Sequence, residues 1–352
     1  MLDDIIEKFG INTDRFEIQK LSSGLINNTW KIGAHSGEFV LQQINTNVFK
    51  SPDDIAENIN RIAAYLSRNH PDYRFVPLVK AKNGEYLVTG PNGETYRFMP
   101  YVKDSLTLET VKNRKQAFEA ARQFGKFTAN LVGFDTSELK MTLPDFHNLL
   151  LRFRQFEDAC NNASPSRLKL AEDEVGKAAK YRGIVETYRS IVENETVPLR
   201  VIHHDTKISN VLFNADHCGI CVIDLDTVMP GYFFSDVGDM MRTYLSPSNE
   251  EETDLTRVMV REDFFSSIID GYLSEMSSTL TDTEKALITY SGKFMIYMQA
   301  IRFLTDYLNG DVYYPTSYPE HNLNRARNQF TLLQSYLAAE NTFSAFLAEL
   351  TG

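Results

Sequence analysis

The chain has 352 residues, of which 43% are hydrophobic, enough to bury the core of one large or two modest domains. Its net charge is −11 and its basic residues form no stripe, which excludes nucleic acid as the expected partner but not a nucleotide. No apolar run approaches the length of a membrane span, the acidic N-terminus is unlike a secretory signal, and the cysteine count of three is odd. We therefore expect a cytoplasmic protein with no membrane partner.

Residues 1–100 predict a sheet-rich domain. A short helix is followed by strand-like runs, by a helix that begins at Ser51 with a proline and two acids in its first turn, and by two more strands. The turn at 22–27 contains Ser23 and Gly24, whose backbone N–H groups are suited to lie over phosphates, although an ordinary hairpin turn explains it equally well. The expected strands cover residues 16–21, 28–33, 38–44, 85–89 and 95–101.

Residues 101–352 predict a second, mostly helical domain. Thr281 and Glu284 form a capping-box pattern at the start of one helix. The expected helices cover residues 107–132, 146–160, 170–193, 235–245, 255–278, 284–309 and 322–349. The result is an α+β protein with a small antiparallel-sheet lobe and a larger helical lobe. Because ligands favour clefts between domains, we expect a nucleotide under the linker near residues 100–103. The backbone groups of Phe98, Met99 and Tyr101 would then meet the edge of its adenine.

One stretch interrupts the helical pattern and carries the chemistry. Between two short apolar strands, His203, Asp205 and Asn210 stand as H-x-D-x-x-x-x-N, and a third apolar strand runs straight into Asp224. Asx residues that cap a turn between strands are the ordinary explanation for any one of these positions. Their joint spacing, followed by an acid at a strand end, favours a phosphate-handling site instead.

Phosphoryl transfer needs positioning and charge neutralisation more than covalent help from the protein. We assign Asp205 to face the attacking hydroxyl, and Asn210 and Asp224 to hold Mg²⁺ against the phosphates of a nucleotide. Magnesium prefers oxygen ligands and keeps several waters, so two protein ligands are sufficient. Lys207 is placed to reach the transferred phosphate as a point charge. The sequence therefore predicts catalytic residues Asp205 and Lys207.

The chain resembles the aminoglycoside phosphotransferase and choline kinase superfamily, and within it most closely the N-acetylhexosamine 1-kinases. The similar phrases are HHDTKISNVLF, VIDLDTVMPG, SDVGDMMRT and AIRFLTDYLNGDVYYPTSYPEHNLNRARNQF. The resemblance implies a protein-kinase-like bilobal fold, ATP with Mg²⁺, catalytic Asp205, metal ligands Asn210 and Asp224, and a bracing role for His203. It also implies that Asp236 bonds back to the loop that carries Asp205.

One departure from kinases of this fold concerns the third strand. They generally place there a lysine that clamps the nucleotide phosphates and pairs with a helix glutamate. Here Gln42 and Gln43 occupy that region, and Glu57 on the next helix lacks its partner. Another cation, such as Lys31, or the metal alone must then neutralise the phosphates. Because of this departure, a second explanation stays open, namely that the protein binds a nucleotide without turning it over.

The acceptor site is predicted from Arg302 and Asp306, which share a helix face, and from Arg242. An Arg302–Asp306 ion pair on a solvated surface is the alternative explanation. The expected activity is transfer of the ATP γ-phosphate to a sugar hydroxyl, most specifically the anomeric hydroxyl of an N-acetylhexosamine. The alternatives are kinases of choline, ethanolamine, homoserine or aminoglycosides.

Overall fold

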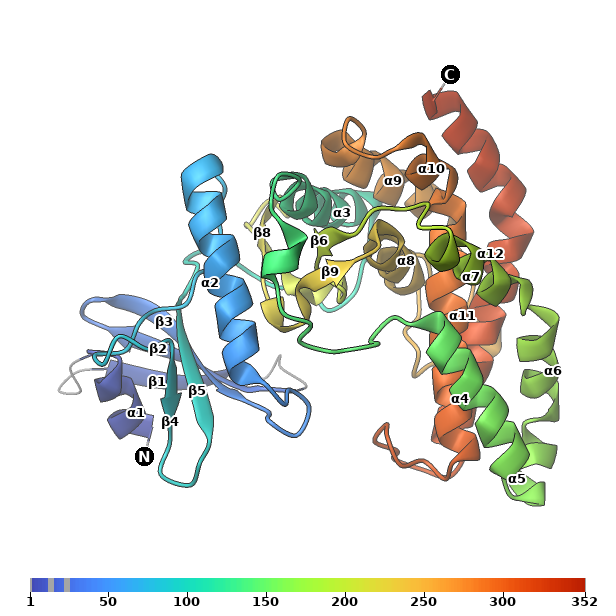
Figure 1. Ribbon diagram of the computed structural model, residues 1–352, viewed down its shortest axis with the longest axis horizontal. Helices are drawn as coiled ribbons and strands as arrows, with labels where there is room; N and C mark the ends of the chain where they lie inside the picture. The colour runs from blue at the N-terminus through green and yellow to red at the C-terminus, as the bar shows by residue number, and fades with distance from the viewer. Residues whose placement is uncertain (1, 12–15, 22–25, 352) are drawn as a thin grey trace.

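The computed structural model describes residues 2–11, 16–21 and 26–351 (Figure 1). In the N-terminal lobe the described strands form one antiparallel sheet in the order β1-β2-β3-β5-β4. The expected alternation of strands and helices is confirmed, with a shorter fourth strand. The elements of this lobe are α1 (Leu2–Lys8), β1 (Phe16–Leu21), β2 (Asn28–Ala34), β3 (Gly37–Ile44), α2 (Pro52–Asn69), β4 (Leu87–Thr89) and β5 (Thr95–Pro100).

Alternation along the strands divides the sheet into a core face and a cavity face. Ile32, Leu41 and Phe98 are fully buried and pack with α1 in the core of the lobe. In an antiparallel pair, neighbouring positions point to opposite faces, so Gln42 of β3 and its cross-strand partner Arg97 of β5 lie on the other face. Helix α2 joins the lobes, because its apolar stripe belongs to the core cluster of the C-terminal lobe.

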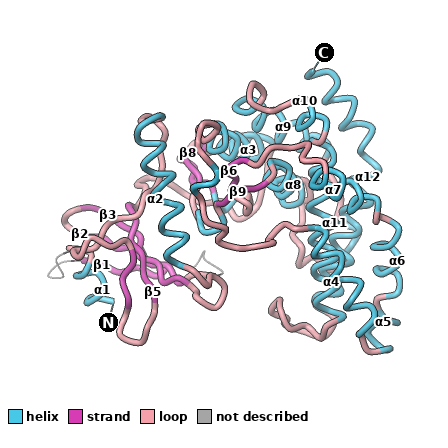
Figure 2. Tube along the Cα trace, in the orientation of Figure 1, coloured by secondary structure: helices cyan, strands magenta, loops and turns pink. Residues whose placement is uncertain are grey.

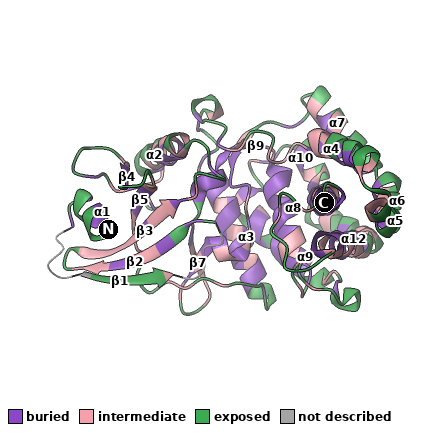
Figure 3. Ribbon diagram, turned by 90° about the horizontal axis from the view of Figure 1, so that it is seen from below, coloured by how far each residue is buried: buried purple, intermediate pink, exposed green. Residues whose placement is uncertain are grey.

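The C-terminal lobe is mostly helical, as expected (Figure 2). Its centre is α11 (Ile288–Leu308), most of whose residues are buried, as expected of a helix enclosed by others. Figure 3 shows buried residues along α3 and α8, and exposed residues on α5 and α6. The helices are α3 (Arg114–Ala129), α4 (Leu149–Asn162), α5 (Pro165–Leu170), α6 (Glu172–Lys180), α7 (Gly183–Glu193), α8 (Phe233–Tyr244), α9 (Glu262–Met276), α10 (Asp282–Ala286), α11 (Ile288–Leu308) and α12 (His321–Thr351).

Two short strand pairs carry the predicted motif. β6 (Arg200–Ile202) pairs with β9 (Met229–Gly231), and β7 (Val211–Phe213) pairs with β8 (Gly219–Val222). Residues 203–210, hereafter the motif loop, therefore connect the first strand pair to the β7–β8 hairpin. The strand β9 was not expected from the sequence, because three residues that include Pro230 give no alternating pattern.

Several helix boundaries differ from the prediction. The expected helix 107–132 begins only at Arg114, where the Asn113 side chain caps it, and 170–193 consists of parts of three helices. Thr281 and Glu284 do form the expected capping box, but the helix that they start ends after five residues, at Ala286. None of the helices in the described residues is both long and apolar enough to cross a membrane. The predicted division of the chain at residue 100, where β5 ends, stays a prediction.

Candidate active site

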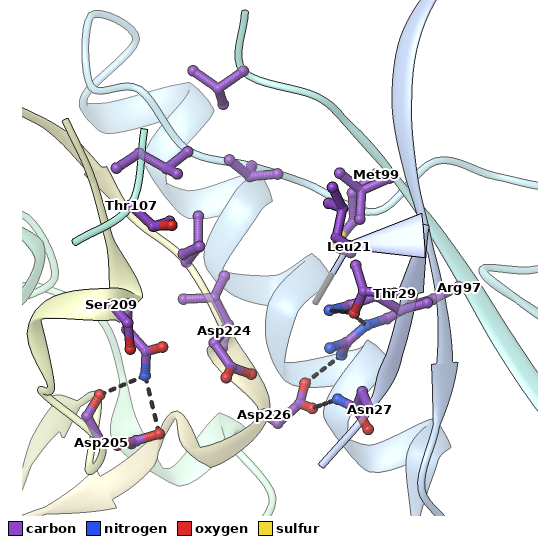
Figure 4. Close-up of a pocket in the computed structure, with 18 of the residues that line it drawn as sticks. Leu21, Asn27, Thr29, Arg97, Met99, Thr107, Asp205, Ser209, Asp224 and Asp226 are labelled. Atoms are coloured by element: carbon purple, nitrogen blue, oxygen red, sulfur yellow. Dashed lines mark hydrogen bonds and ion pairs between the residues drawn. The ribbon is translucent and has the colours of Figure 1, made fainter. Parts of the chain in front are cut away.

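A cavity of about 610 Å³ lies between the lobes, and both contribute to its walls (Figure 4). The sheet provides Thr29, Gln42 and Arg97 from its cavity face, and the C-terminal lobe provides Asp205 and Asp224. The predicted catalytic and metal-binding side chains are thus brought together with residues from strands more than a hundred positions earlier in the chain.

Two carboxylates of α8 fix the backbone of the motif loop. Asp236 accepts hydrogen bonds from the backbone N–H groups of His203 (2.8 Å) and His204 (2.7 Å). Asp239 accepts one from the N–H of Thr206 at 2.8 Å. Burial raises the pKa of Asp236 to about 6, although these bonds and His203 oppose the shift. The expectation that Asp236 bonds back to this loop is confirmed.

His203 braces the loop from the opposite side. The side chain is fully buried, its Nε2 lies 2.9 Å from the carbonyl oxygen of Ile223, and its ring meets Phe124 edge to face. The hydroxyl of Thr227 donates to the His203 carbonyl at 2.6 Å. Anchoring at both ends holds the backbone on either side of Asp205 in one position, which a reacting carboxylate requires.

The Asp205 carboxylate lies in a cationic, hydrogen-bonded setting. Its Oδ2 accepts from the Nζ of Lys207 at 2.9 Å and from the Nδ2 of Asn210 at 3.0 Å. Burial alone raises the pKa of Asp205, but Lys207, His203 and Asn210 together hold it below its ordinary value. Asp205 is therefore ionised at neutral pH and able to accept a proton from a hydroxyl.

Asp224 lies two residues after the end of β8 and adopts a left-handed backbone conformation (φ 62°), which Asp tolerates better than most residues. The backbone N–H of Ile223 donates to the carbonyl of Asn210 at 2.8 Å, so the two predicted metal ligands occupy neighbouring strand ends. The Asp224 side chain is exposed to the cavity. Enclosure by protein, together with Asp226 and Asp205, raises its pKa to about 7.

The donor set fits Mg²⁺. Burial, Asp226 and Asp205 raise the pKa of Asp224, so a divalent cation beside Asp224 would offset this repulsion, and Asn210 adds an amide oxygen. Nowhere in the part of the chain that is described, this site included, is a group of three or more His, Cys, Asp or Glu side chains arranged to hold a metal ion, so Mg²⁺ here would have two protein ligands. The roles of Asn210 and Asp224 as metal ligands stay predictions.

The predicted nucleotide contacts have different outcomes. Met99 and Tyr101 line the cavity, as expected of residues that meet the adenine of a nucleotide. Phe98 does not: its ring stacks on Phe9 and Phe39 in the core, and its carbonyl accepts from the N–H of Val79. The alternation of side chains along β5 turns Phe98 to the core face, and a contact between its backbone and a nucleotide stays a prediction. Ser23 and Gly24 lie outside the described residues.

The third strand does lack a cation at the cavity. Lys31, the substitute suggested by the sequence, forms an ion pair with Glu38 at 2.5 Å and lies 4.0 Å from the ring centre of Tyr101, outside the cavity wall. Glu57 instead pairs with Arg61, one helical turn further along α2. Sequence reasoning missed Arg97, which lines the cavity beside Gln42. Only the pairing register of β3 with β5 reveals this neighbour.

Three predicted acceptor residues, Arg302, Asp306 and Arg242, do not line the interlobe cavity. Asp306 does not pair with Arg302: its carboxylate accepts from the backbone N–H groups of Val312, Tyr313 and Tyr314 and so holds that loop. Arg242 pairs with Asp239 (3.1 Å) and Glu250 (2.7 Å). Roles for Asp306 and Arg242 in acceptor binding stay predictions, with their polar groups already engaged.

Arg302 is the member of this set whose charge is available. Its guanidinium lies 5.6 Å from the ring centres of both Phe146 and Tyr314, and no carboxylate of the described residues pairs with it. Nearby, His147 contacts His204 through their Nδ1 atoms at 3.2 Å. Burial, His204 and neighbouring arginines hold the pKa of His147 well below its ordinary value. Sequence reasoning missed His147, since a lone histidine carries no motif.

Comparison with known proteins agrees with this geometry. Residues 17–261 match the model of the phosphotransferase enzyme family. The fold is similar to that of a microcompartment-associated aminopropanol kinase, with a TM-score of 0.63 and 17% identity over 96% of this chain and 97% of that one. It is also similar to an aminoglycoside phosphotransferase from Alicyclobacillus acidocaldarius (TM-score 0.62, 12% identity, 94% and 92% covered) and to a choline kinase from Cryptosporidium parvum (0.58, 13%, 97% and 96%). Since the family model spans well over half of its length, the chain belongs to the phosphotransferase enzyme family.

Proposed function

We propose that this protein transfers the γ-phosphate of ATP to a hydroxyl group of a sugar, and most specifically to the anomeric hydroxyl of an N-acetylhexosamine. The observation that carries the transfer is the ionised Asp205 carboxylate at the wall of the interlobe cavity, bonded to Lys207 and Asn210. In a kinase, one carboxylate of the catalytic loop accepts the proton of the acceptor hydroxyl, and neighbouring residues hold the metal ions that bind the phosphates.

The steps follow from these positions. Asp205 accepts the hydroxyl proton as the acceptor oxygen forms its bond to the γ-phosphorus. The bond from that phosphorus to the oxygen bridging to the β-phosphate breaks, and ADP leaves. Lys207 offsets the charge of the moving phosphoryl group. Asn210 and Asp224 would hold Mg²⁺, which supplies charge neutralisation to the phosphates when bound.

Arginines near His147 favour a neutral acceptor over a cationic one. Arg302 has no carboxylate partner in the described part of the chain, and the same is true of Arg152, which is near enough for their charges to repel. A quaternary or primary ammonium would be repelled by these arginines. A sugar offers hydroxyl and amide oxygens that guanidinium groups donate to, and apolar ring faces that stack on aromatic rings such as Tyr314.

An amino alcohol is the second candidate acceptor, because the aminopropanol kinase and the choline kinase that share this fold are named for such substrates. The test is ADP release with MgATP across N-acetylhexosamines, neutral hexoses, choline, ethanolamine, homoserine and an aminoglycoside. We expect an N-acetylhexosamine to give the highest kcat/KM and its 1-deoxy analogue to give none. Faster turnover of an amino alcohol would refute the sugar assignment.

Asp205→Asn supplies the control for chemistry. An amide of the same size cannot take the proton, so kcat is expected to fall by about 10²- to 10⁴-fold while ATP binds at least as tightly. Undiminished turnover in this variant would remove the mechanism. ATP binding without turnover of any acceptor by the unaltered protein would instead support a nucleotide-binding protein that lacks catalysis.

A further inference from the structure

We propose that Arg97 of β5 provides the phosphate-neutralising cation that the third strand lacks; this deepens the proposed function and rests on ATP being the ligand of the interlobe cavity. The guanidinium belongs to the strand that pairs with β3, opposite Gln42, in the region where kinases of this fold generally have a lysine. Gln42 and Arg97 are cross-strand partners, and the Nε of Arg97 donates to the Oε1 of Gln42 at 2.9 Å.

The cation is held in one orientation by both lobes. Its Nη1 forms an ion pair with Asp226, and Asp226 also accepts from the Nδ2 of Asn27 at 2.9 Å. Both charged side chains are at most 2% exposed. Gln42 in turn donates to the hydroxyl of Thr29 at 3.1 Å, so the side chain that receives Nε is itself fixed. Figure 4 shows Arg97, Asp226 and Asn27 joined in this way at the cavity wall.

The ion pair with Asp226 leaves part of the guanidinium for a ligand. Arg97 has five N–H donors, and within the described residues its Nη2 has no hydrogen-bond partner. Arg97 lines the same cavity as Asp205 and Asp224. A guanidinium fixed in this way beside the metal-binding acid is placed to donate to phosphate oxygens, the groups that its geometry fits best.

A purely structural ion pair between the lobes is the competing explanation, and variants separate the two. Asp226→Asn removes the ion pair but keeps Arg97. The double variant Arg97→Gln/Asp226→Asn removes both charges without leaving either one buried alone, which protects the fold. These two proteins differ only at position 97, so any difference in phosphate binding between them belongs to Arg97.

The measurement is the Kd of ATP and of adenosine, with Mg²⁺, by calorimetry on the full chain. We expect the double variant to bind ATP at least 10-fold more weakly than Asp226→Asn, with the Kd of adenosine changed less than threefold. Adding Gln42→Lys to the double variant, which places an amine at the expected third-strand position, should recover most of the lost ATP affinity.

Equal ATP affinity in the single and the double variant would overturn the inference, and so would an equal loss for adenosine, since adenosine has no phosphate. Both results are read against the unaltered protein. If that protein bound no ATP, the proposed function itself would fail. If it bound ATP and Arg97→Gln/Asp226→Asn bound ATP as tightly as Asp226→Asn does, only the role of Arg97 would be refuted.

Discussion

Gly238 allows the helix that positions the motif loop to sit against α11, and replacing it with alanine tests that arrangement. A Cβ at this position would lie 2.2 Å from the carbonyl oxygen of Ser291 and 2.9 Å from the Cβ of Met295. Ordinary contact begins near 3.4 Å, so α8 must withdraw from α11 by about 1 Å. Gly238 stands between Asp236 and Asp239, the two acids that hold the loop.

The magnitude follows from this displacement. Overpacking of a core contact costs about 1–3 kcal/mol. A shift of about 1 Å would also stretch the 2.8 Å bond from the N–H of His203 to Asp236 beyond hydrogen-bond range, at about 1.5–3 kcal/mol. The better helix propensity of alanine returns about 1 kcal/mol. Gly238→Ala should therefore lose about 2–5 kcal/mol of unfolding free energy, and kcat should fall about 10²-fold with the misplaced loop.

The matched control is Gly176→Ala in α6, where no heavy atom lies within 4 Å of the added Cβ. This variant should gain about 0.5–1 kcal/mol from helix propensity alone. Urea unfolding measures both free energies, and ADP release gives kcat for the folded fraction. A Gly238→Ala protein as stable as the unaltered one would refute the packing argument. Lost stability with an unchanged kcat would refute the link from α8 to the loop.

Three further variants probe the site. Asn210→Ala removes an amide oxygen from the predicted metal site, so half-saturation of ADP release should need at least about 10-fold more Mg²⁺; an unchanged Mg²⁺ titration would contradict this. Arg302→Gln should raise KM for the sugar about 10-fold or more through loss of a charged donor, and a parallel rise in KM for ATP would count against a specific acceptor role. His204→Asn should make the free energy of unfolding less sensitive to acid. Burial lowers the pKa of His204 from 6.5 to about 3, so the contribution of His204 to stability is full above pH 6.5 and is lost as the pH falls. The difference in unfolding free energy between the unaltered protein and His204→Asn should therefore shrink by about 1.4 kcal/mol per pH unit between pH 6 and 4, whereas a difference independent of pH would contradict the shift.

The local part of the site was predictable because its geometry is encoded over short distances. Asp205 and Asn210 belong to one loop, and Asp224 ends a strand that pairs with the strand following that loop. Hairpin pairing alone then brings the three side chains together. The spacing of the motif carries this information, so the sequence reveals it without any knowledge of the tertiary fold.

Residues that depend on tertiary pairing were not predictable in the same way. Arg97 reaches the cavity only through the pairing register of β3 with β5. The alternation of side chains along β5 then places Phe98 in the core. The breaks after Leu170 and Ala286 have neither proline nor glycine at the turn residue, so the helical pattern of the sequence runs through both. Packing against neighbouring helices decides such boundaries, and a single sequence does not contain those contacts explicitly.

The balance of charge at the cavity connects the metal to the nucleotide. Asp205, Asp224 and Asp226 supply three carboxylates, against the cations Lys207 and Arg97. A nucleotide triphosphate that enters alone adds several negative charges to a wall that is already acidic. Burial, Asp226 and Asp205 raise the pKa of Asp224, so its ionised form is disfavoured even before any phosphate arrives. Mg²⁺ bound to the phosphates reverses this repulsion, so ATP and the metal ion are expected to bind together, each raising the affinity for the other by the same factor.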